Sequence, residues 1–518
     1  MRLTGHRAWP AAAAAAVVVG GVGAFIAVPR TDTTWLLHVT DKLLDGATLG
    51  VDVVENSPPV ILWLKVPVVL LARATGWDAW LLWVVAVTML GVGALILAGR
   101  LLRAVPSLAG AADLLAAVFA VGLFLLPLLD FGQREHVTVA LVVPWLLAVA
   151  ARAEGSPLPT GWATAAALGG GLGLSIKPHF GLVWLLVAGV LLVRERSART
   201  LVAPELTAAA LVPGLAILAT FLLHPDWLGY ARLYGPLYLR FGYENPFWIG
   251  LVGEGIEWSW LGILALLAFA PAIRPWPGSL SVLAAALVGF HLAAILQAKG
   301  WGYHFLPAST VGLFVAAAAA TCANWSGDRL VRRLYRVAVP LGIAVVAGGG
   351  VWRAVELLAL PERKWEEADP SLRALVREVG RSGRTETLLL LSINISAGFP
   401  LTYLTGSDWT SRHPSLWALA AVYPREFRRR GMVPVHPPAG RPADERRIAT
   451  ELEADIVKRP PTMVILPRPE PEGPIWAGSQ RFDYRAYFAG PAGEGSVPCL
   501  DGPPRPVEAY LVWRCERQ

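Results

Sequence analysis

The sequence predicts a mainly α-helical protein that crosses a membrane many times and ends in a domain of mixed helices and strands. The first observation is composition: the 518 residues are 55% hydrophobic and 16% charged, with a mean hydropathy of +0.51. This is more apolar and less charged than a soluble domain. The second is a series of apolar runs of about 20 residues, the length with which a helix crosses a bilayer. The third is a change to soluble composition after about residue 356.

We expect eleven membrane spans. The apolar stretch at 59–74 is excluded because Lys65, Pro67 and Arg73 interrupt it, and we expect it to be a helix on or dipping into the outer surface. Many of the 22 tryptophans flank the spans, as interfacial anchors do. The expected spans are 9–28, 78–99, 107–129, 137–152, 161–176, 180–194, 201–223, 256–272, 279–297, 305–322 and 336–355.

The distribution of arginines orients these spans. With the N-terminus in the cytoplasm, the inside segments hold thirteen arginines, as the positive-inside rule requires. The short outside loops hold five cations: Arg134, Lys177, Arg232, Arg240 and Lys299. Counting 59–74 as a span would reverse this pattern. We therefore expect a multi-pass protein of the plasma (inner) membrane, with a cytoplasmic N-terminus and a C-terminal domain on the exoplasmic or periplasmic side.

The chain divides into two parts in this interpretation. Residues 1–356 form the polytopic domain, with a first outer loop at 29–77, and residues 357–518 form a soluble α/β domain. Apolar runs at 387–394, 462–467 and 508–514 have the length of buried strands. Cys499 and Cys515 share the C-terminal tail and would form a disulfide in an oxidising compartment.

The first outer loop places an acid directly after the first span. Asp32 precedes TWLLHVTDKLLDG, in which apolar residues recur at helical spacing and Gly46 supplies a stop, typical of a helix lying on the membrane surface. Asp32 is either a helix N-cap or a general base that removes a proton from an acceptor hydroxyl, and the two roles are compatible. Asp52 and Glu55 are interpreted as solvated loop acids.

Three further polar motifs fall on the same outer face. An ionisable group at a membrane interface suggests recognition or an internal ion pair, and a buried cation can hold a phosphate. The alternative for a terminal lysine is snorkelling to the headgroups, and for the aromatics an interfacial belt. The predicted substrate-binding residues are Gln133, Arg134, Glu135 and His136 of DFGQREH, Lys177 and His179 of KPH, and Lys299, Tyr303 and His304 of QAKGWGYH.

A fourth outer segment, 224–246, has repeated tyrosines and reads as another surface-lying amphipathic helix, with or without a functional role. The sequence contains no phosphate-binding P-loop, no HExxH, no CxxC and no GxSxG nucleophile elbow in a strand–helix context. The glycines at 169–173 lie within a span and are expected to permit close helix packing.

The pattern as a whole resembles the GT-C superfamily of membrane glycosyltransferases, in particular the aminoarabinose transferase and protein O-mannosyltransferase group. The resemblance rests on an Asp just past the first span, a surface helix ending in LLDG, the acidic stretch before Pro58-Pro59, and the many spans followed by an outer domain. In one respect the chain differs: several relatives carry a Lys before the two prolines that contacts the donor phosphate, and Asn56-Ser57 stand there instead.

The resemblance implies transfer of a sugar from a polyprenyl-phosphate donor to a hydroxyl of a glycan, lipid or protein acceptor. Asp32 would match the catalytic acidic residue of the family. Arg134, Lys177 or Lys299 would bind the phosphate, and no nucleic acid is expected as a partner. No cofactor is certain, although an acid pair such as Asp32 with Glu135 would suit a divalent cation. Two alternatives stay open: a flippase or transporter of lipid-linked saccharides, and a saccharide ligase or polymerase using lipid-diphosphate donors.

Overall fold

The computed structural model describes residues 8–242, 256–297, 299–323, 329–360, 370–395, 398–426, 436, 438–468, 484–489, 497, 499–500 and 502–515. By its internal contacts the chain forms two compact units. The helical unit comprises Met1–Ala27, Ser57–Thr220 and Asn245–Ala359. The sheet unit comprises Val28–Asn56, Phe221–Glu244 and Leu360–Gln518.

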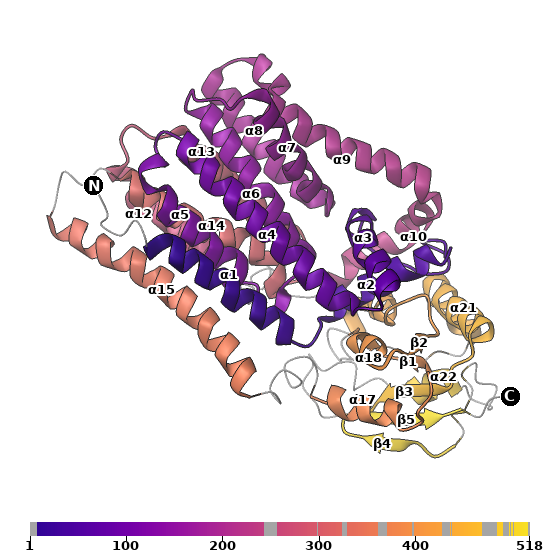
Figure 1. The fold of residues 1–518 in the computed structure, drawn as a ribbon. Coiled ribbons are helices and arrows are strands. Elements are labelled where there is room, and N and C mark those ends of the chain that lie inside the picture. The colour runs from indigo at the N-terminus through magenta and orange to yellow at the C-terminus, as the bar shows by residue number, and fades with distance from the viewer. Residues whose placement is uncertain are drawn as a thin grey trace. The chain divides into compact units, whose positions relative to one another are not determined.

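The helical unit consists of long apolar helices, and each expected span coincides with one of them (Figure 1). Of the described helices, seven are long and apolar enough to cross a membrane, and two shorter apolar stretches lie at Ala109–Leu125 and Ser259–Ala272. A polytopic helical membrane protein is therefore confirmed. The helices are α1 (Ala8–Ile26), α3 (Val60–Thr75), α4 (Ala79–Ala104), α5 (Ala112–Ala120), η2 (Val121–Leu125), α6 (Arg134–Ala153), α7 (Thr160–Ser175), α8 (Gly181–Glu195), α9 (Pro204–Leu223), α12 (Ile256–Phe269), α13 (Gly278–Gln297), α14 (Leu306–Cys322) and α15 (Arg329–Ala359).

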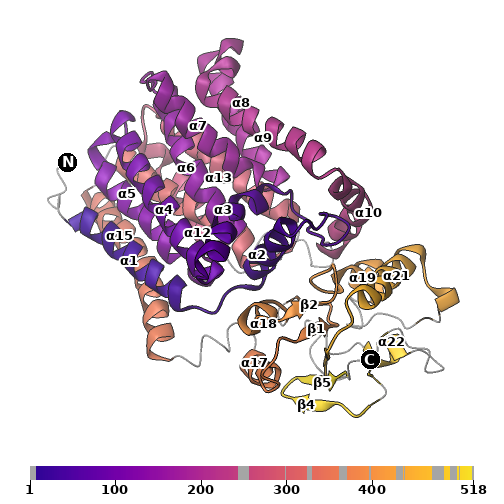
Figure 2. The ribbon, with the colours of Figure 1, turned by 45° about the vertical axis from the view of Figure 1, so that its right-hand side comes forward.

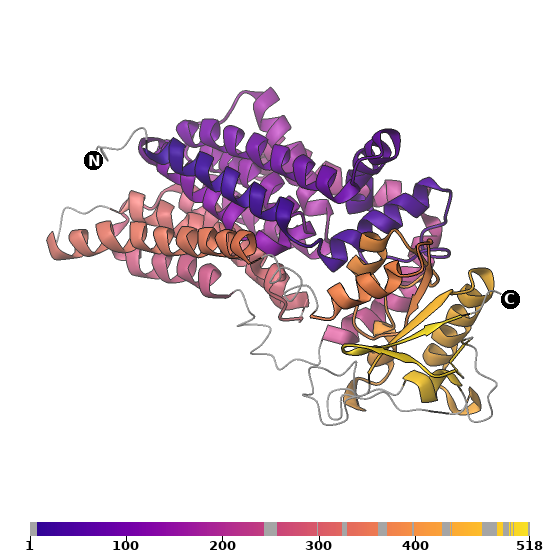
Figure 3. The same ribbon diagram turned by 60° about the horizontal axis from the view of Figure 1, so that its bottom comes forward.

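Small residues allow these helices to approach closely. A Cβ at Gly171 in α7 would lie 2.8 Å from the carbonyl oxygen of Ala209 in α9, and one at Gly173 would lie 3.1 Å from that of Thr138 in α6. The glycine-rich run thus packs α7 against both neighbours, as the sequence predicts. Figure 3 shows a second close pair, with the orange α15 running beside the indigo α1.

The sheet unit is built on five strands in the order β2-β1-β3-β5-β4. Strand β1 pairs in parallel with β2 and β3, whereas β5 is antiparallel to both β3 and β4. The three predicted strands are confirmed as β1, β3 and β5. The strands are β1 (Thr387–Leu390), β2 (Asp408–Trp409), β3 (Met463–Pro467), β4 (Arg505–Val507) and β5 (Tyr510–Arg514), and the helices are α2 (Thr31–Leu44), α10 (Pro225–Gly242), α17 (Leu372–Gly380), α18 (Gly398–Thr405), α19 (Trp417–Val422), α21 (Ala443–Lys458) and α22 (Tyr484–Ala489) (Figure 2).

The sheet unit includes two segments, Val28–Asn56 and Phe221–Glu244, that the sequence assigned to the polytopic domain. In α10, Tyr230, Tyr234 and Leu237 enter the apolar core formed by the strands and by α19 and α21. Trp227 donates to the carbonyl oxygen of Glu55 at 2.7 Å. The amphipathic helix predicted for 224–246 is thus present over Pro225–Gly242, but its apolar face is covered by protein rather than by a membrane surface. Residues 243–246 lie outside the described part.

The helix after the first span also differs from its predicted setting. Trp35 is 2% exposed, packs edge-on against Phe399 of α18 at 4.9 Å, and donates to Glu55 at 3.0 Å. Glu55 is therefore a buried acceptor, and its interpretation as a solvated acid is wrong. Asp52 is exposed as predicted and pairs with Lys458 at 2.6 Å. Gly46, with φ of +89°, ends the helix as expected.

Cys499 and Cys515 form a disulfide across 16 residues of sequence. Replacing both by serine is expected to lower the free energy of unfolding of the sheet unit by about 3 kcal/mol. A bridge that closes a loop of about 15 residues lowers the conformational entropy of the unfolded chain and so raises its free energy by about that value. Chemical denaturation of the full chain, followed by tryptophan fluorescence, checks this. An unchanged midpoint in the serine variant would show that the bridge adds no stability.

Candidate active site

The polar corner of the helical unit begins at the turn before α6. Gly132 has φ of +77°, and its carbonyl accepts from Trp83 Nε1 at 3.0 Å. His136 closes the turn: its Nδ1 accepts from the Gly132 N–H at 3.0 Å, and its Nε2 lies 2.7 Å from the Leu123 carbonyl oxygen. Both ring nitrogens are thus engaged by backbone. His136 holds the turn in place, which argues against the direct substrate contact that the sequence suggests.

Glu135 joins three of the predicted motifs. Its side chain is fully buried, and Oε1 accepts from Lys177 Nζ at 2.5 Å. Lys177 also donates to Gln297 Oε1 at 2.8 Å. These residues come from the start of α6, from the turn between α7 and α8, and from the end of α13. The fold therefore brings DFGQREH, KPH and QAKGWGYH together, although they are far apart in the sequence.

The third motif supplies the aromatic side of this corner. His304 is 1% exposed, and its Nε2 lies 3.9 Å from Glu135 Oε1. Tyr303 stacks edge-on against His304 at 4.4 Å, with Lys177 Nζ 5.9 Å from the tyrosine ring centroid. Lys299 is 4% exposed and lies 6.0 Å from the ring centroid of Trp301. Of the three predicted residues of QAKGWGYH, His304 and Tyr303 thus lie near the Glu135–Lys177 pair, and Lys299 lies near Trp301.

Arg134 is directed toward the segment before the two prolines. Its Nη1 donates to the hydroxyl of Ser57, and the side chain is 8% exposed. The positive charge of Arg134 also disfavours protonation of His179 and His304. A guanidinium therefore lies beside the residue that directly precedes Pro58-Pro59.

The corner contains several buried polar atoms that have no hydrogen-bond partner among the described residues. Such atoms are rare in folded proteins and often mark a site for a ligand, ion or water. They are Glu135 Oε2, Gln133 Oε1, His179 Nε2, both ring nitrogens of His304, and Lys65 Nζ. The arrangement supplies cationic donors and a carboxylate acceptor in an apolar surrounding, where hydrogen bonds to an oxyanion are strong.

Lys65 is the member of this group that is not among the site residues predicted from the sequence. It lies in α3, is fully buried, and places Nζ 3.5 Å from the ring centroid of Trp83. Burial, and then the charge of Arg134, lower the pKa of Lys65 well below its usual range. The sequence did contain a sign of this residue, because Lys65 stands inside a 16-residue apolar helix. A lysine is costly to bury there unless it has a role.

Asp32 belongs to the sheet unit, whereas the other predicted site residues belong to the helical unit. Helix α2 begins at Thr31, and its N-cap is Arg30. The N-cap interpretation of Asp32 is therefore wrong: the carboxylate lies in the first helical turn, where the helix dipole favours a negative charge. This position leaves the side chain partly exposed.

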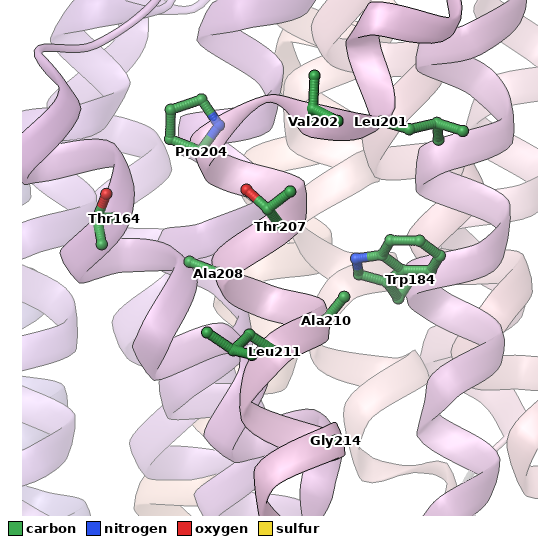
Figure 4. A pocket seen from close by; sticks show the side chains of 10 residues that line it. All are labelled: Thr164, Trp184, Leu201, Val202, Pro204, Thr207, Ala208, Ala210, Leu211 and Gly214. Carbon is green, nitrogen blue, oxygen red and sulfur yellow. The ribbon is translucent and has the colours of Figure 1, made fainter.

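A separate apolar pocket of about 750 Å³ lies on α7, α8 and α9 (Figure 4). Trp184, Leu201 and Leu211 line it, and the indole N–H of Trp184 donates to the Leu206 carbonyl oxygen at 3.1 Å. Its polar side chains besides Trp184 are Thr164 and Thr207, and none of its lining residues is charged. The pocket suits a hydrocarbon chain but not a phosphate.

The comparisons with known proteins concern the fold. No family model and no curated protein sequence matches the chain. Among solved structures, the chain is similar to the crystal structure of ArnT from Cupriavidus metallidurans bound to undecaprenyl phosphate, with a TM-score of 0.55 and 12% sequence identity. The match covers 98% of this chain and 99% of that one. The polytopic helical architecture with a C-terminal domain that the sequence predicts is confirmed, and this chain shares the fold of ArnT over nearly its whole length.

Proposed function

We propose that the protein is an integral-membrane glycosyltransferase that takes a sugar from a polyprenyl-phosphate donor. The observation that carries the proposal is the shared fold with ArnT, whose structure holds undecaprenyl phosphate, over 98% of this chain. The buried cationic corner supports it, because a lipid phosphate bound near apolar helices needs charged donors away from water. The acceptor in this proposal is a hydroxyl group of a glycan, lipid or protein.

In the proposed reaction the acceptor oxygen attacks the anomeric carbon while the bond from that carbon to the phosphate oxygen breaks. Asp32 takes the hydroxyl proton, and the polyprenyl phosphate leaves with the bonding electrons. Donors from Arg134, Lys177 and Lys299 stabilise the growing negative charge on the phosphate. Arg134, beside Ser57, takes the part of the lysine that several GT-C relatives carry before Pro-Pro.

The purified chain, reconstituted in lipid nanodiscs with a panel of radiolabelled polyprenyl-phosphate sugars, tests this function. Release of polyprenyl phosphate together with a labelled product supports the proposal. Comparison of lipid-linked and surface glycans with and without the gene then identifies the acceptor. Movement of intact lipid-linked sugar across the bilayer without transfer would instead favour a flippase.

A divalent cation is a further proposal, from the acid pair noted in the sequence. Among the described residues no group of three or more His, Cys, Asp or Glu side chains gathers to hold a metal. Glu135 is already paired with Lys177. Transfer rates measured with EDTA and with added Mg²⁺ or Mn²⁺ decide whether the reaction needs a metal.

The orientation proposed here places the sheet unit on the exoplasmic side, which the disulfide supports because such bonds persist in oxidising compartments. In a Cys322→Ala background, Thr48→Cys and Ala454→Cys are expected to react with a membrane-impermeant thiol reagent in intact cells, and Ala198→Cys is not. All three positions are exposed in the structure. Labelling of Ala198→Cys alone would show that the chain has the opposite orientation in the membrane.

A further inference from the structure

The sheet unit contains a second polar cavity, distinct from the corner around Glu135. It measures about 490 Å³ and lies between the end of α2 with the loop that follows, the segment after β2, and the end of α21. This volume is in the range of small-molecule sites, about 300–1,000 Å³. All of its lining residues belong to one unit, so the cavity is a feature of the sheet unit by itself.

The cavity is lined by four cationic and three acidic side chains, and internal pairs account for part of this charge. Arg412 binds Asp455 through two nitrogens, with distances of 2.8 and 2.9 Å to Oδ1. Lys458 binds Asp52 at 2.6 Å, which holds the pKa of Asp52 below its usual range. These pairs form walls that accept hydrogen bonds but carry little net charge.

Outside these two pairs the lining holds the cations Lys42 and Arg459 and the acid Asp45, which leaves one net positive charge. Lys42 is 3.7 Å from Asp408, whose side chain is 53% exposed and therefore screened by water. Arg459 gives one guanidinium N–H to the Trp409 carbonyl oxygen at 2.7 Å, out of five that the group carries. Burial lowers the pKa of His38 to about 3, and the charges of Lys42 and Arg459 add to that effect. Both cations therefore act on the same end of the cavity.

Thr410 provides an independent sign of a ligand. It lines the cavity, is 5% exposed, and its hydroxyl has no hydrogen-bond partner among the described residues. Its backbone is fixed, because the N–H donates to the Leu388 carbonyl oxygen at 3.0 Å. A buried hydroxyl without a partner is unfavourable in the empty protein, and rotation of the Thr410 side chain toward the cavity would let a ligand hydroxyl or oxyanion satisfy it.

We propose that this cavity binds an anionic saccharide, with its phosphate or carboxylate on Lys42 and Arg459 and its hydroxyl groups on Thr410 and the neighbouring carboxylates. A lone inorganic anion would fill little of the volume, whereas a hexose bearing an acidic group matches both the cationic end and the acceptor-rich walls. The proposal does not depend on the transferase activity, since it concerns binding to the sheet unit.

Isothermal titration calorimetry on the full chain in phosphatidylcholine nanodiscs tests the proposal, with glucose 6-phosphate, inorganic phosphate and glucose as probes. Glucose 6-phosphate is expected to bind more tightly than either other probe. Lys42→Gln and Arg459→Gln are each expected to weaken it about tenfold, since a hydrogen bond to a charged group is worth about 1.5–3 kcal/mol and exposure reduces this. Arg377→Gln, an exposed arginine of α17, is the matched control and should bind normally.

Thr410→Val separates binding from folding. The valine has nearly the same shape and removes an unpaired hydroxyl, so the melting temperature should not fall, while affinity for glucose 6-phosphate should drop about fivefold. Absence of saturable binding, or binding that Lys42→Gln and Arg459→Gln leave unchanged, overturns the proposal. Equal affinity for inorganic phosphate and glucose 6-phosphate also overturns it, because the cavity would then recognise a free anion only.

Discussion

Asp32→Asn is expected to reduce sugar transfer by about 10²–10⁴-fold while leaving the protein folded, because general-base catalysis contributes that factor and an amide cannot accept the proton. The substitution keeps the size of the side chain. Its cost to folding includes the interaction of a first-turn carboxylate with the helix dipole, about 0.3–1 kcal/mol. Single-turnover transfer from a polyprenyl-phosphate sugar, measured beside a melting curve, checks both parts.

The same substitution at Asp41 of helix α2 provides a matched control. It removes one carboxylate from the same helix at a position that the mechanism does not use, so its transfer rate should be close to that of the parent. Near-normal turnover of Asp32→Asn would show that Asp32 is not the general base and only contributes a negative charge at the start of the helix. A large drop in both variants would point to a general effect of charge in α2.

Arg134→Gln is expected to weaken use of the lipid donor by roughly ten- to a hundredfold, since hydrogen bonds to charged groups are worth about 1.5–3 kcal/mol. The loss should appear as a higher KM for the donor or a lower kcat/KM, with acceptor binding unchanged. Arg134→Lys should recover part of the activity, because it keeps the charge but loses the planar fork of donors. Arg199→Gln, at an exposed arginine of the helical unit, is the control.

Lys177 and Lys299 enter the same experiment with one complication that only the structure reveals. Lys177→Gln alone would leave the buried Glu135 carboxylate without its ion-pair partner, at a cost to folding of about 3–5 kcal/mol. The double variant Glu135→Gln with Lys177→Gln avoids this, because it removes both charges together. If one phosphate binds all three cations, losses from Arg134, Lys177 and Lys299 should not add. Parent-like donor kinetics in Arg134→Gln, Lys299→Gln and the double variant would place the phosphate elsewhere.

Hydrophobic length and charge were sufficient to predict the membrane class, the position of each apolar span and the polar clusters at the ends of spans. A helix that crosses a bilayer must bury its backbone and present about 20 apolar side chains, so this signal is local and strong. The GT-C resemblance rested on such local features: Asp32 after the first span, the LLDG helix and the Pro58-Pro59 turn. The shared fold with ArnT confirms the polytopic architecture that this resemblance implied.

The settings of α2 and α10 could not be predicted in this way. An amphipathic helix has the same sequence pattern whether its apolar face meets lipid or protein, and only the partner decides. For α10 that partner is the core of the sheet unit, which Tyr230 and Tyr234 enter from a segment more than a hundred residues earlier in the chain. The pairing of Trp35 with Glu55 likewise depends on the chain turning back on itself.

By itself, then, the sequence determined which stretches are long and apolar enough to cross a membrane and which polar residues end them, because those properties depend on neighbours along the chain. Only the tertiary structure decided that Glu135 joins Lys177, that His136 is bound by backbone, and that Lys65 is buried beside Trp83. It alone brought Lys42, Thr410 and Arg459 to one cavity. These are contacts between residues distant in sequence, and their geometry depends on how whole helices and strands pack rather than on any local pattern.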